Sequence, residues 1–166
     1  PLQAKQIVQN ICSALSNLDA QNADLYQHNT QLYLAQLDAL DEAFRTVVAQ
    51  GRRTEMIFGS PFSLYYFTQR YGLSYEAAFD SCTGESEPSV ATLVHLIEHI
   101  KQAQIPVVYI TELSDPKIAQ SISEETGAEI LLFHACHNVS REDFQNGVSY
   151  LSLMWQNVEH LKKGLQ

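Results

Sequence analysis

The hydrophobic pattern of the first fifty residues is typical of two amphipathic helices. Ile7, Ile11 and Leu15 recur at intervals of four residues, which places them on one side of a helix. The polar segment 19–22 contains residue types that cap helices, and we expect it to end the first helix. Apolar residues then recur at helical intervals through a second, longer helix, which we predict over residues 23–48.

After residue 50 the pattern changes to short apolar runs that alternate with amphipathic segments. The runs predict strands and the segments between them predict helices. The predicted strands are 54–58, 75–79, 107–110 and 129–133, and the predicted helices are 61–71, 89–103 and 116–126. Strands that alternate with helices favour right-handed crossovers and a parallel sheet. We therefore expect an α/β fold with a four-stranded parallel sheet flanked by helices over residues 51–166, preceded by a helical arm of residues 1–50.

Polar residues and glycine mark the ends of the later helices. Asp115 followed by Pro116 is a favourable helix start, because Asp caps and Pro fits the first turn. Gly127 is placed to end the same helix. Ser140 and Asp143, three residues apart, resemble a capping box and predict one last helix. The apolar side of that helix carries Phe144, Val148, Leu151, Trp155 and Val158.

The composition permits a packed core and narrows the choice of partners. The chain has 166 residues, of which 45% are hydrophobic and 17% are charged, so it fits a single domain or one lobe of a larger protein. Its net charge of -9 argues against nucleic acid or an anionic membrane as the main partner. We find no bilayer-spanning run and no secretion signal. The chain begins at Pro1 rather than Met, and we interpret it as a processed or excised fragment.

The most informative segment for chemistry is 134–138, His-Ala-Cys-His-Asn, which follows the fourth predicted strand. In an open parallel sheet, ligands bind outside the carboxyl ends of the strands. His134, Cys136 and His137 would offer nitrogen and sulfur donors there, which a borderline-soft cation such as zinc prefers. The alternative is a polar loop after a core strand, with one histidine hydrogen-bonded to the backbone.

Carboxylates follow the other strands at the same edge. Asp80, Glu85 and Glu87 follow the second predicted strand, and Glu112 follows the third. Glu112 has three possible roles: it could ligate a metal, orient a ligating histidine, or cap the helix near Asp115.

The three cysteines leave the redox state of the chain open. Cys82 and Cys136 are both predicted at the carboxyl edge of the sheet, where a disulfide between them would join two loops. Two free buried thiols are the alternative. Cys12 lies on the first helix, and we expect it in the core.

One motif suggests an enzyme instead. His95-Leu96-Ile97-Glu98-His99 matches the H-x-x-E-H pattern of the inverted zinc proteases. On a helical projection both histidines fall almost opposite the apolar residues, toward solvent. A protease site needs this helix to face a cleft with a third ligand, so we interpret the motif as a polar outer face. A metal-dependent hydrolase that uses His95, Glu98 and His99 is the alternative function.

From Gly51 onward, the order of motifs resembles the metal-binding proteins of ABC importers for zinc and manganese, the zinc-uptake or lipoprotein-adhesin family. The resembling segments are 61–75 (PFSLYYFTQRYGLSY), 85–93 (ESEPSVATL), 105–133 (IPVVYITELSDPKIAQSISEETGAEILLF) and 149–165 (SYLSLMWQNVEHLKKGL). The opening PLQAKQIVQNICSALSNLD resembles the family's segment just after its second metal-binding histidine. The resemblance covers essentially the whole chain, but only the second half of a family member.

The resemblance implies two α/β lobes bridged by a long helix, with about four side chains holding a metal ion between them. This chain would be the C-terminal lobe, without the N-terminal lobe. His134 falls at the family's last ligand position, with His137 as an additional donor and Glu112 in support. Ser60 and Pro61 stand near the family's third ligand position, and neither residue type is a good ligand.

The resemblance also implies a function without catalysis. The protein would carry zinc or manganese to an ABC permease from the cell surface, lipid-anchored, or from the periplasm. We expect a monomer, and a host-binding adhesin is a further alternative.

Overall fold

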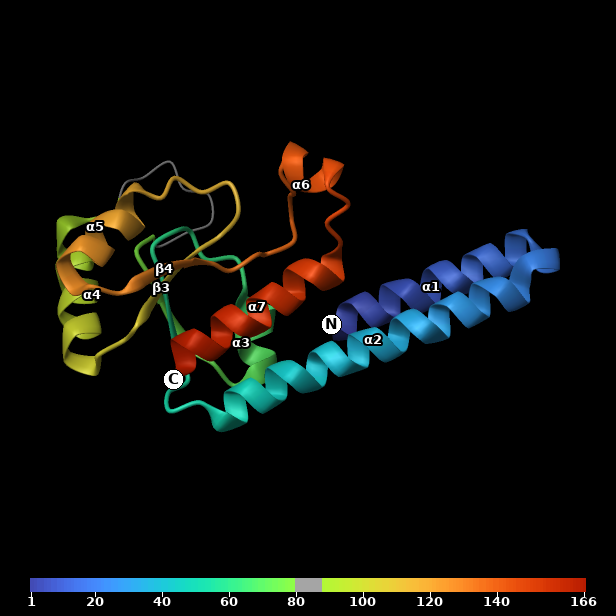
Figure 1. Ribbon diagram of the computed structural model, residues 1–166, viewed down its shortest axis with the longest axis horizontal. Coiled ribbons are helices and arrows are strands. Elements are labelled where there is room, and N and C mark those ends of the chain that lie inside the picture. The colour runs from blue at the N-terminus through green and yellow to red at the C-terminus, as the bar shows by residue number, and fades with distance from the viewer. Residues whose placement is uncertain (80–87) are drawn as a thin grey trace. The chain divides into compact units, whose positions relative to one another are not determined.

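The computed structural model describes residues 1–79 and 88–166 (Figure 1). These residues fall into two compact units, Pro1–Thr46 and Val47–Gln166. The division lies within one long helix.

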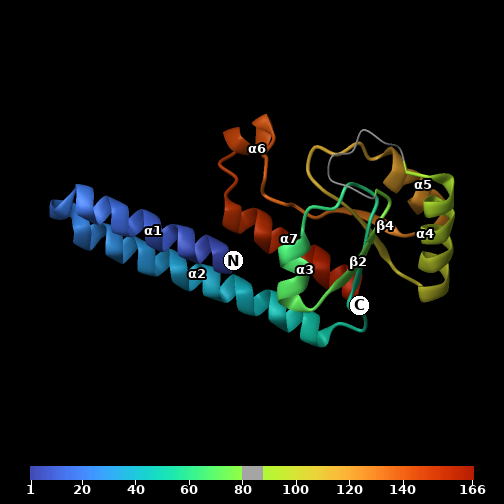
Figure 2. The same ribbon diagram turned by 180° about the vertical axis from the view of Figure 1, so that it is seen from behind.

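The first unit is a helical hairpin. Helix α1 (Leu2–Leu18) is followed by a short 3-10 turn (Ala20–Asn22) and by α2 (Ala23–Gln50). The two long helices lie side by side in both views (Figures 1 and 2), and an ion pair between Lys5 and Asp38 joins them. The predicted pair of helices and the break between them are confirmed.

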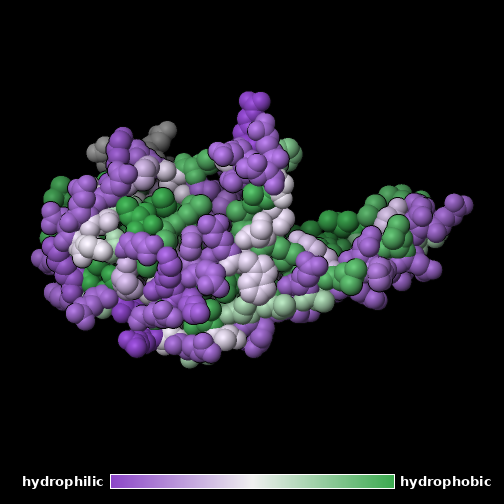
Figure 3. Space-filling view, viewed as in Figure 1, coloured by the Kyte–Doolittle hydropathy of each residue, from purple (hydrophilic) through white to green (hydrophobic). Residues whose placement is uncertain are grey.

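The apolar side of α1 is exposed. Ile7, Ile11 and Leu15 have 58%, 53% and 40% of their surface accessible, and no residue of α1 is buried. Figure 3 shows hydrophobic surface among polar side chains on the hairpin. Cys12, which we expected in the core, is only partly buried. No helix of the described residues has the length and apolar character needed to cross a membrane.

The second unit is built on a parallel sheet. Its strands are β1 (Glu55–Phe58), β2 (Ser74–Ala77), β3 (Val107–Ile110) and β4 (Glu129–Leu132), in the order β2-β1-β3-β4. The connecting helices are α3 (Tyr65–Tyr71), α4 (Val90–Ala103) and α5 (Lys117–Thr126). All strand pairs are parallel, as the alternation of strands and helices predicted.

The two faces of the sheet bury different side chains. Aliphatic residues of α4 and α5 pack against Ile57 and Val108 on one face. On the other face an aromatic cluster surrounds Phe58, whose ring lies 5.5 Å from Tyr109 and 6.5 Å from Phe133 between centroids. The last helix contacts this part of the sheet. Gly164 permits the close approach, because a Cβ there would lie 1.9 Å from the Tyr109 hydroxyl.

The last predicted helix is two helices in the structure, and this prediction was wrong. Helix α6 (Arg141–Gln145) ends before Gly147, whose φ of +70° interrupts the helix. Ser149 then begins α7 (Tyr150–Leu165) with its own capping box, a strong competing start signal. The predicted apolar side is buried only in part: Val158 is buried, whereas Phe144 is 73% and Trp155 41% exposed. The buried residues of α7 are Met154, Asn157, Val158, Leu161, Gly164 and Leu165.

The helix ends predicted around α5 are close to those observed. Gly127 ends the helix with a left-handed φ of +75°, as expected. At the start, Pro116 is the capping residue rather than part of the first turn. Asp115 still accepts a hydrogen bond from the Lys117 N–H at 3.0 Å.

Candidate functional site

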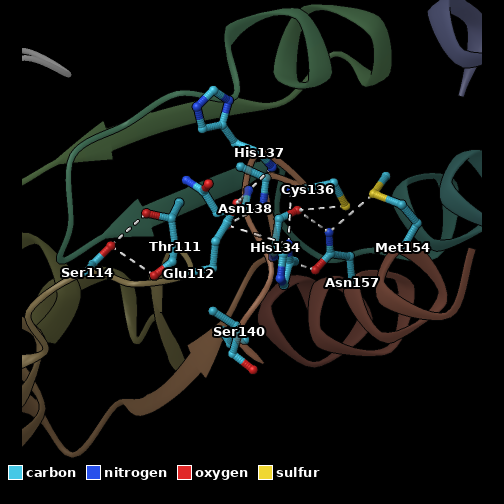
Figure 4. A network of polar contacts seen from close by, with 12 residues as sticks. Thr111, Glu112, Ser114, His134, Cys136, His137, Asn138, Ser140, Met154 and Asn157 are labelled. Atoms are coloured by element: carbon cyan, nitrogen blue, oxygen red, sulfur yellow. Dashed lines mark hydrogen bonds and ion pairs between the residues drawn. The ribbon is translucent and has the colours of Figure 1, made fainter. Parts of the chain in front are cut away.

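The 134–138 loop follows β4 at the carboxyl edge of the sheet, beside the segment that follows β3 (Figure 4). The ends of β1 and β3 are joined here by Ser60. Its buried hydroxyl accepts the Thr111 N–H at 3.0 Å. Ser60 therefore supports the chain just before Glu112, and its role toward a metal stays a prediction.

The Glu112 carboxylate accepts hydrogen bonds from the backbone of the 134–138 loop. One carboxylate oxygen, Oε2, accepts the N–H of Ala135 at 2.7 Å. The other, Oε1, accepts the N–H groups of His137 at 2.9 Å and Asn138 at 3.3 Å. The side chain is only 8% exposed. Of the three roles expected for Glu112, orienting His134 is compatible with the 3.6 Å between Glu112 Oε2 and His134 Nδ1. The structure adds a role that was not expected: the carboxylate fixes the conformation of the neighbouring loop.

The loop environment keeps Glu112 ionised and Cys136 protonated at neutral pH. Burial raises the pKa of Glu112, but the backbone hydrogen bonds lower it more, so the pKa lies below its usual value. For Cys136, burial and the nearby Glu112 charge raise the thiol pKa to about 11. Because the thiolate is the form that binds metals, Cys136 is a weak candidate ligand here.

His134 is buried, with 4% of its surface exposed. Its backbone forms two hydrogen bonds with the side chain of Asn157 in α7. The His134 N–H donates to Asn157 Oδ1, and Asn157 Nδ2 donates to the His134 carbonyl, both at 2.7 Å. The ring atom Nδ1 accepts the Cys136 N–H at 2.9 Å. An Nδ1 that accepts is unprotonated, so in a neutral ring the proton is on Nε2.

This tautomer decides how His134 can bind a metal. An imidazole nitrogen that carries a proton has no lone pair for an ion, so ligation by Nε2 requires the proton to move to Nδ1. Glu112 Oε2 lies 3.6 Å from Nδ1. That carboxylate can accept the relocated N–H after a small movement, the partnership often found behind metal-ligating histidines.

His137 is exposed, and its ring points away from the His134 network (Figure 4). It lies at a hollow of about 420 Å³. The hollow is lined by Pro61, Ser63, Thr111, Glu112, Ala135, His137 and Asn138. The hollow is at the expected edge of the sheet, but the two imidazoles of the loop do not converge. Within residues 1–79 and 88–166, no group of three potential ligands includes either ring.

Several predicted site residues lie outside the described residues, namely Asp80, Cys82, Glu85 and Glu87. Cys136 itself carries a free thiol in the structure. The pairing of Cys82 with Cys136 therefore stays a prediction.

Two residues at the site have unusual backbone conformations. Leu113, next to Glu112, has a φ of +60°, and Cys136, inside the loop, has a φ of +59°. A left-handed conformation costs a residue with a side chain on the order of 1 kcal/mol, and such strain collects at functional sites. The hydrogen bonds from the loop to Glu112 fix Cys136 in this conformation from both sides.

A second cluster of histidines and carboxylates lies on the α4 side of the sheet. His99 Nε2 is 2.8 Å from Glu55 Oε2, and His95 Nε2 is 3.3 Å from Glu76 Oε2. Sequence reasoning selected the two histidines but missed Glu55 and Glu76. Glu98, the third residue of the H-x-x-E-H motif, is exposed and takes no part in this cluster. The motif therefore does not assemble into the protease arrangement that was the alternative interpretation.

Comparison with known proteins gives one consistent match. The sequence profile of the family described as ZnuA, zinc-uptake complex component A periplasmic, matches residues 1–164. The high-affinity zinc uptake system protein ZnuA of Bacillus subtilis is 28% identical over 165 residues, 99% of this chain and 51% of the relative. The zinc-binding lipoprotein AdcA of Streptococcus pneumoniae is 26% identical over 98% of this chain and 32% of the relative.

Solved structures agree with the sequence match. The metal-dependent lipoprotein YcdH of B. subtilis superposes with a TM-score of 0.84 at 28% identity, covering 99% of this chain and 61% of that protein. The Zn(II)-bound ZnuA-like domain of S. pneumoniae AdcA superposes with a TM-score of 0.79 at 26% identity, with the same coverage. The chain thus spans about half the length of the first relative and about three fifths of these structures.

Proposed function

Because this chain belongs to the zinc-uptake complex component A family, we propose that it is the C-terminal lobe of a solute-binding protein that carries zinc to an ABC permease. In this function the lobe binds and releases an ion and performs no catalysis. The 134–138 loop is its contribution to the ion site, and the N-terminal lobe supplies the other ligands.

The observation that carries this proposal is the fastening of the loop by Glu112. Three backbone N–H groups donate to one buried carboxylate, so the loop is rigid at the edge of the sheet where parallel α/β proteins bind ligands. His134 and His137 both extend from this loop. Imidazole ligands favour zinc over harder cations such as manganese.

Within this proposal the two histidines have different tasks. His134 ligates through Nε2 once its proton has moved to Nδ1, facing Glu112 Oε2 at 3.6 Å. His137 is exposed beside the hollow and ligates after a rotation of its side chain. The ionised Glu112 also provides a negative charge that attracts the cation.

The proposed partners and location follow from the same family. The relatives are named as a zinc uptake system protein and a zinc-binding lipoprotein. We therefore place the full-length protein outside the cytoplasmic membrane, held by a lipid anchor or in the periplasm, where it docks as a monomer on its permease.

Zinc titration of the full-length protein tests this function. We expect His134→Ala to weaken zinc binding at least tenfold by isothermal titration calorimetry, and His137→Ala to weaken it less. His28→Ala, an exposed histidine of the hairpin, is the matched control and should bind as the parent does. If both loop variants keep the parent affinity while circular dichroism shows them folded, the loop is not the zinc site.

A further inference from the structure

We propose that Glu55, Glu76, His95 and His99 form an accessory site for a divalent cation of the zinc type, separate from the 134–138 loop. We call these four residues the α4 cluster. The proposal goes beyond the transport function, because it concerns the α4-covered face of the sheet rather than the carboxyl edge.

The sheet register explains why the two carboxylates meet. Glu76 of β2 pairs with Ile57 of β1, and Ile57 points into the core beneath α4. Since side chains alternate along a strand, Glu55 points to the same face as Ile57. Glu55 and Glu76 are therefore diagonal neighbours on the face that α4 covers.

Helix α4 supplies two imidazoles above these carboxylates. His95 and His99 are one helical turn apart, with ring centroids 6.2 Å apart and ring planes inclined by only 14°. One ligand atom from each of Glu55, Glu76 and His99 lies within 4.8 Å of the other two. His95 Nε2 is 3.3 Å from the same Glu76 carboxylate, so a fourth donor is at hand.

The charges of the cluster favour a cation. Two carboxylates on neighbouring strands repel each other. Within the described residues, Glu76 forms an ion pair with His95 and Glu55 forms one with His99. The hydrogen bond that His99 donates to the Glu55 carboxylate raises the pKa of His99, against a smaller opposing effect of burial. The cluster thus already attracts a proton, and one divalent ion would neutralise both carboxylates at once.

The donor set and the exposure also suit an ion that enters from solvent. Two nitrogens and two carboxylate oxygens are ligands that zinc accepts in a tetrahedral arrangement. The side chains of Glu55, Glu76 and His99 are 26%, 34% and 30% exposed, and that of His95 is 67% exposed. An ion can therefore reach the cluster without unfolding of the sheet, and His95 needs only a side-chain rotation to complete the site.

Occupancy of this site would link three elements of the second unit. The ligands come from β1, β2 and α4, so a bound ion joins the edge of the sheet to the helix that covers it. A ligand that binds only the folded state raises stability by mass action. We therefore expect zinc to raise the melting temperature of the protein through the α4 cluster as well as through the transport site.

Zinc-edge anomalous diffraction from crystals of the full-length protein at saturating zinc locates the ion directly. We expect a peak between Glu55, Glu76 and His99, present also in the His134→Ala variant. Persistence of this peak in that variant separates the accessory site from the transport site, so each proposal can fail alone. An absence of anomalous density at the α4 cluster would overturn the accessory site.

Stoichiometry in solution provides the second test. By equilibrium dialysis with zinc, we expect His99→Ala and Glu76→Gln each to lose one bound ion relative to the parent protein. Glu98→Gln removes a carboxylate from the same helix outside the cluster and should leave the count unchanged. Glu76→Gln keeps the test valid if His99→Ala fails to fold. Equal counts for the parent and Glu76→Gln would refute the proposal.

Discussion

The 134–138 loop with Glu112 and the α4 cluster are made of the same residue types but use them differently. In the loop, both oxygens of the Glu112 carboxylate accept backbone N–H groups, and His134 Nδ1 does the same. In the α4 cluster, the carboxylates of Glu55 and Glu76 face imidazole nitrogens. The loop is built around its carboxylate, whereas the α4 cluster leaves its carboxylates available to a cation.

In both regions a metal ion must displace a proton. At the α4 cluster it replaces the Nε2 protons that His95 and His99 direct at the carboxylates, whereas at the loop the His134 proton must move from Nε2 to Nδ1. The His-Ala-Cys-His sequence suggested three ligands from one segment, yet one ring is committed to the backbone and the other points away. The α4 cluster has no continuous motif, because its carboxylates come from two strands that are distant in sequence. Its ligand atoms nevertheless converge within 4.8 Å.

The largest expected effect that separates the two regions is on stability. Glu112→Ala leaves three N–H groups of the loop without their acceptor, and we expect the free energy of unfolding to fall by ~2–4 kcal/mol. Glu76→Gln, at the partly exposed α4 cluster, should change it by less than ~0.5 kcal/mol. Urea denaturation of both variants measures the contrast. A loss below ~0.5 kcal/mol for Glu112→Ala would show that the Glu112 carboxylate is not a structural group.

The pH dependence of unfolding sharpens the same contrast. The pKa of Glu112 is lowered in the folded protein, so its contribution is present above the unfolded pKa of roughly 4.3 and is lost as pH falls through the folded pKa. The difference in stability between the parent protein and Glu112→Ala should therefore shrink below about pH 4. A constant difference between pH 7 and pH 3 would contradict this explanation.

A smaller loss of stability is expected when the hydrogen bonds between Asn157 and the His134 backbone are removed. Asn157→Ala deletes the donor and the acceptor that bind the His134 backbone, and we expect the free energy of unfolding to fall by ~1–3 kcal/mol. Asn157→Asp keeps the acceptor and loses the donor, so its loss separates the two hydrogen bonds. Thermal unfolding followed by circular dichroism measures both. An unchanged midpoint of thermal unfolding for Asn157→Ala would show that these two hydrogen bonds do not stabilise the loop.

The smallest effect concerns the α4 cluster in the absence of metal. Glu55→Gln removes the charged partner of His99, and the pKa of His99 should fall toward its usual value. With a raised pKa, the His99–Glu55 pair stabilises the folded protein below about pH 6.5. This stabilisation is lost as the pH rises through the folded pKa of His99. The variant should therefore differ in stability from the parent mainly at acidic pH. NMR titration of the His99 ring protons measures the shift. Glu98→Gln is the control that should leave it unaltered.

The sequence was sufficient to predict most of the fold because the signals were local. Apolar residues at intervals of about four predicted both helices of the hairpin, and short apolar runs predicted all four strands. Gly127 ends α5 as expected. The last helix was wrong because apolar spacing continued through Gly147, whose left-handed φ divides the segment. Periodicity alone gave no sign that the Ser149 cap would begin a separate helix.

The sequence predicted where the candidate site lies but not how its side chains interact. The carboxyl edge of the sheet correctly located Glu112 beside the 134–138 loop. The hydrogen bonds of Glu112 and the tautomer of His134 depend on atomic positions that no spacing encodes. The pairing of Glu55 and Glu76 with the α4 histidines depended on the strand register, which the sequence does not specify.

The hydrogen bonds between Asn157 and the His134 backbone affect how fast the loop can bind an ion. Because α7 and Glu112 already hold residues 134–138 from two sides, this segment loses its conformational entropy during folding and not when an ion arrives. Capture should then need no refolding of the loop backbone, only the proton relocation at His134 and rotations of single side chains, which take nanoseconds or less.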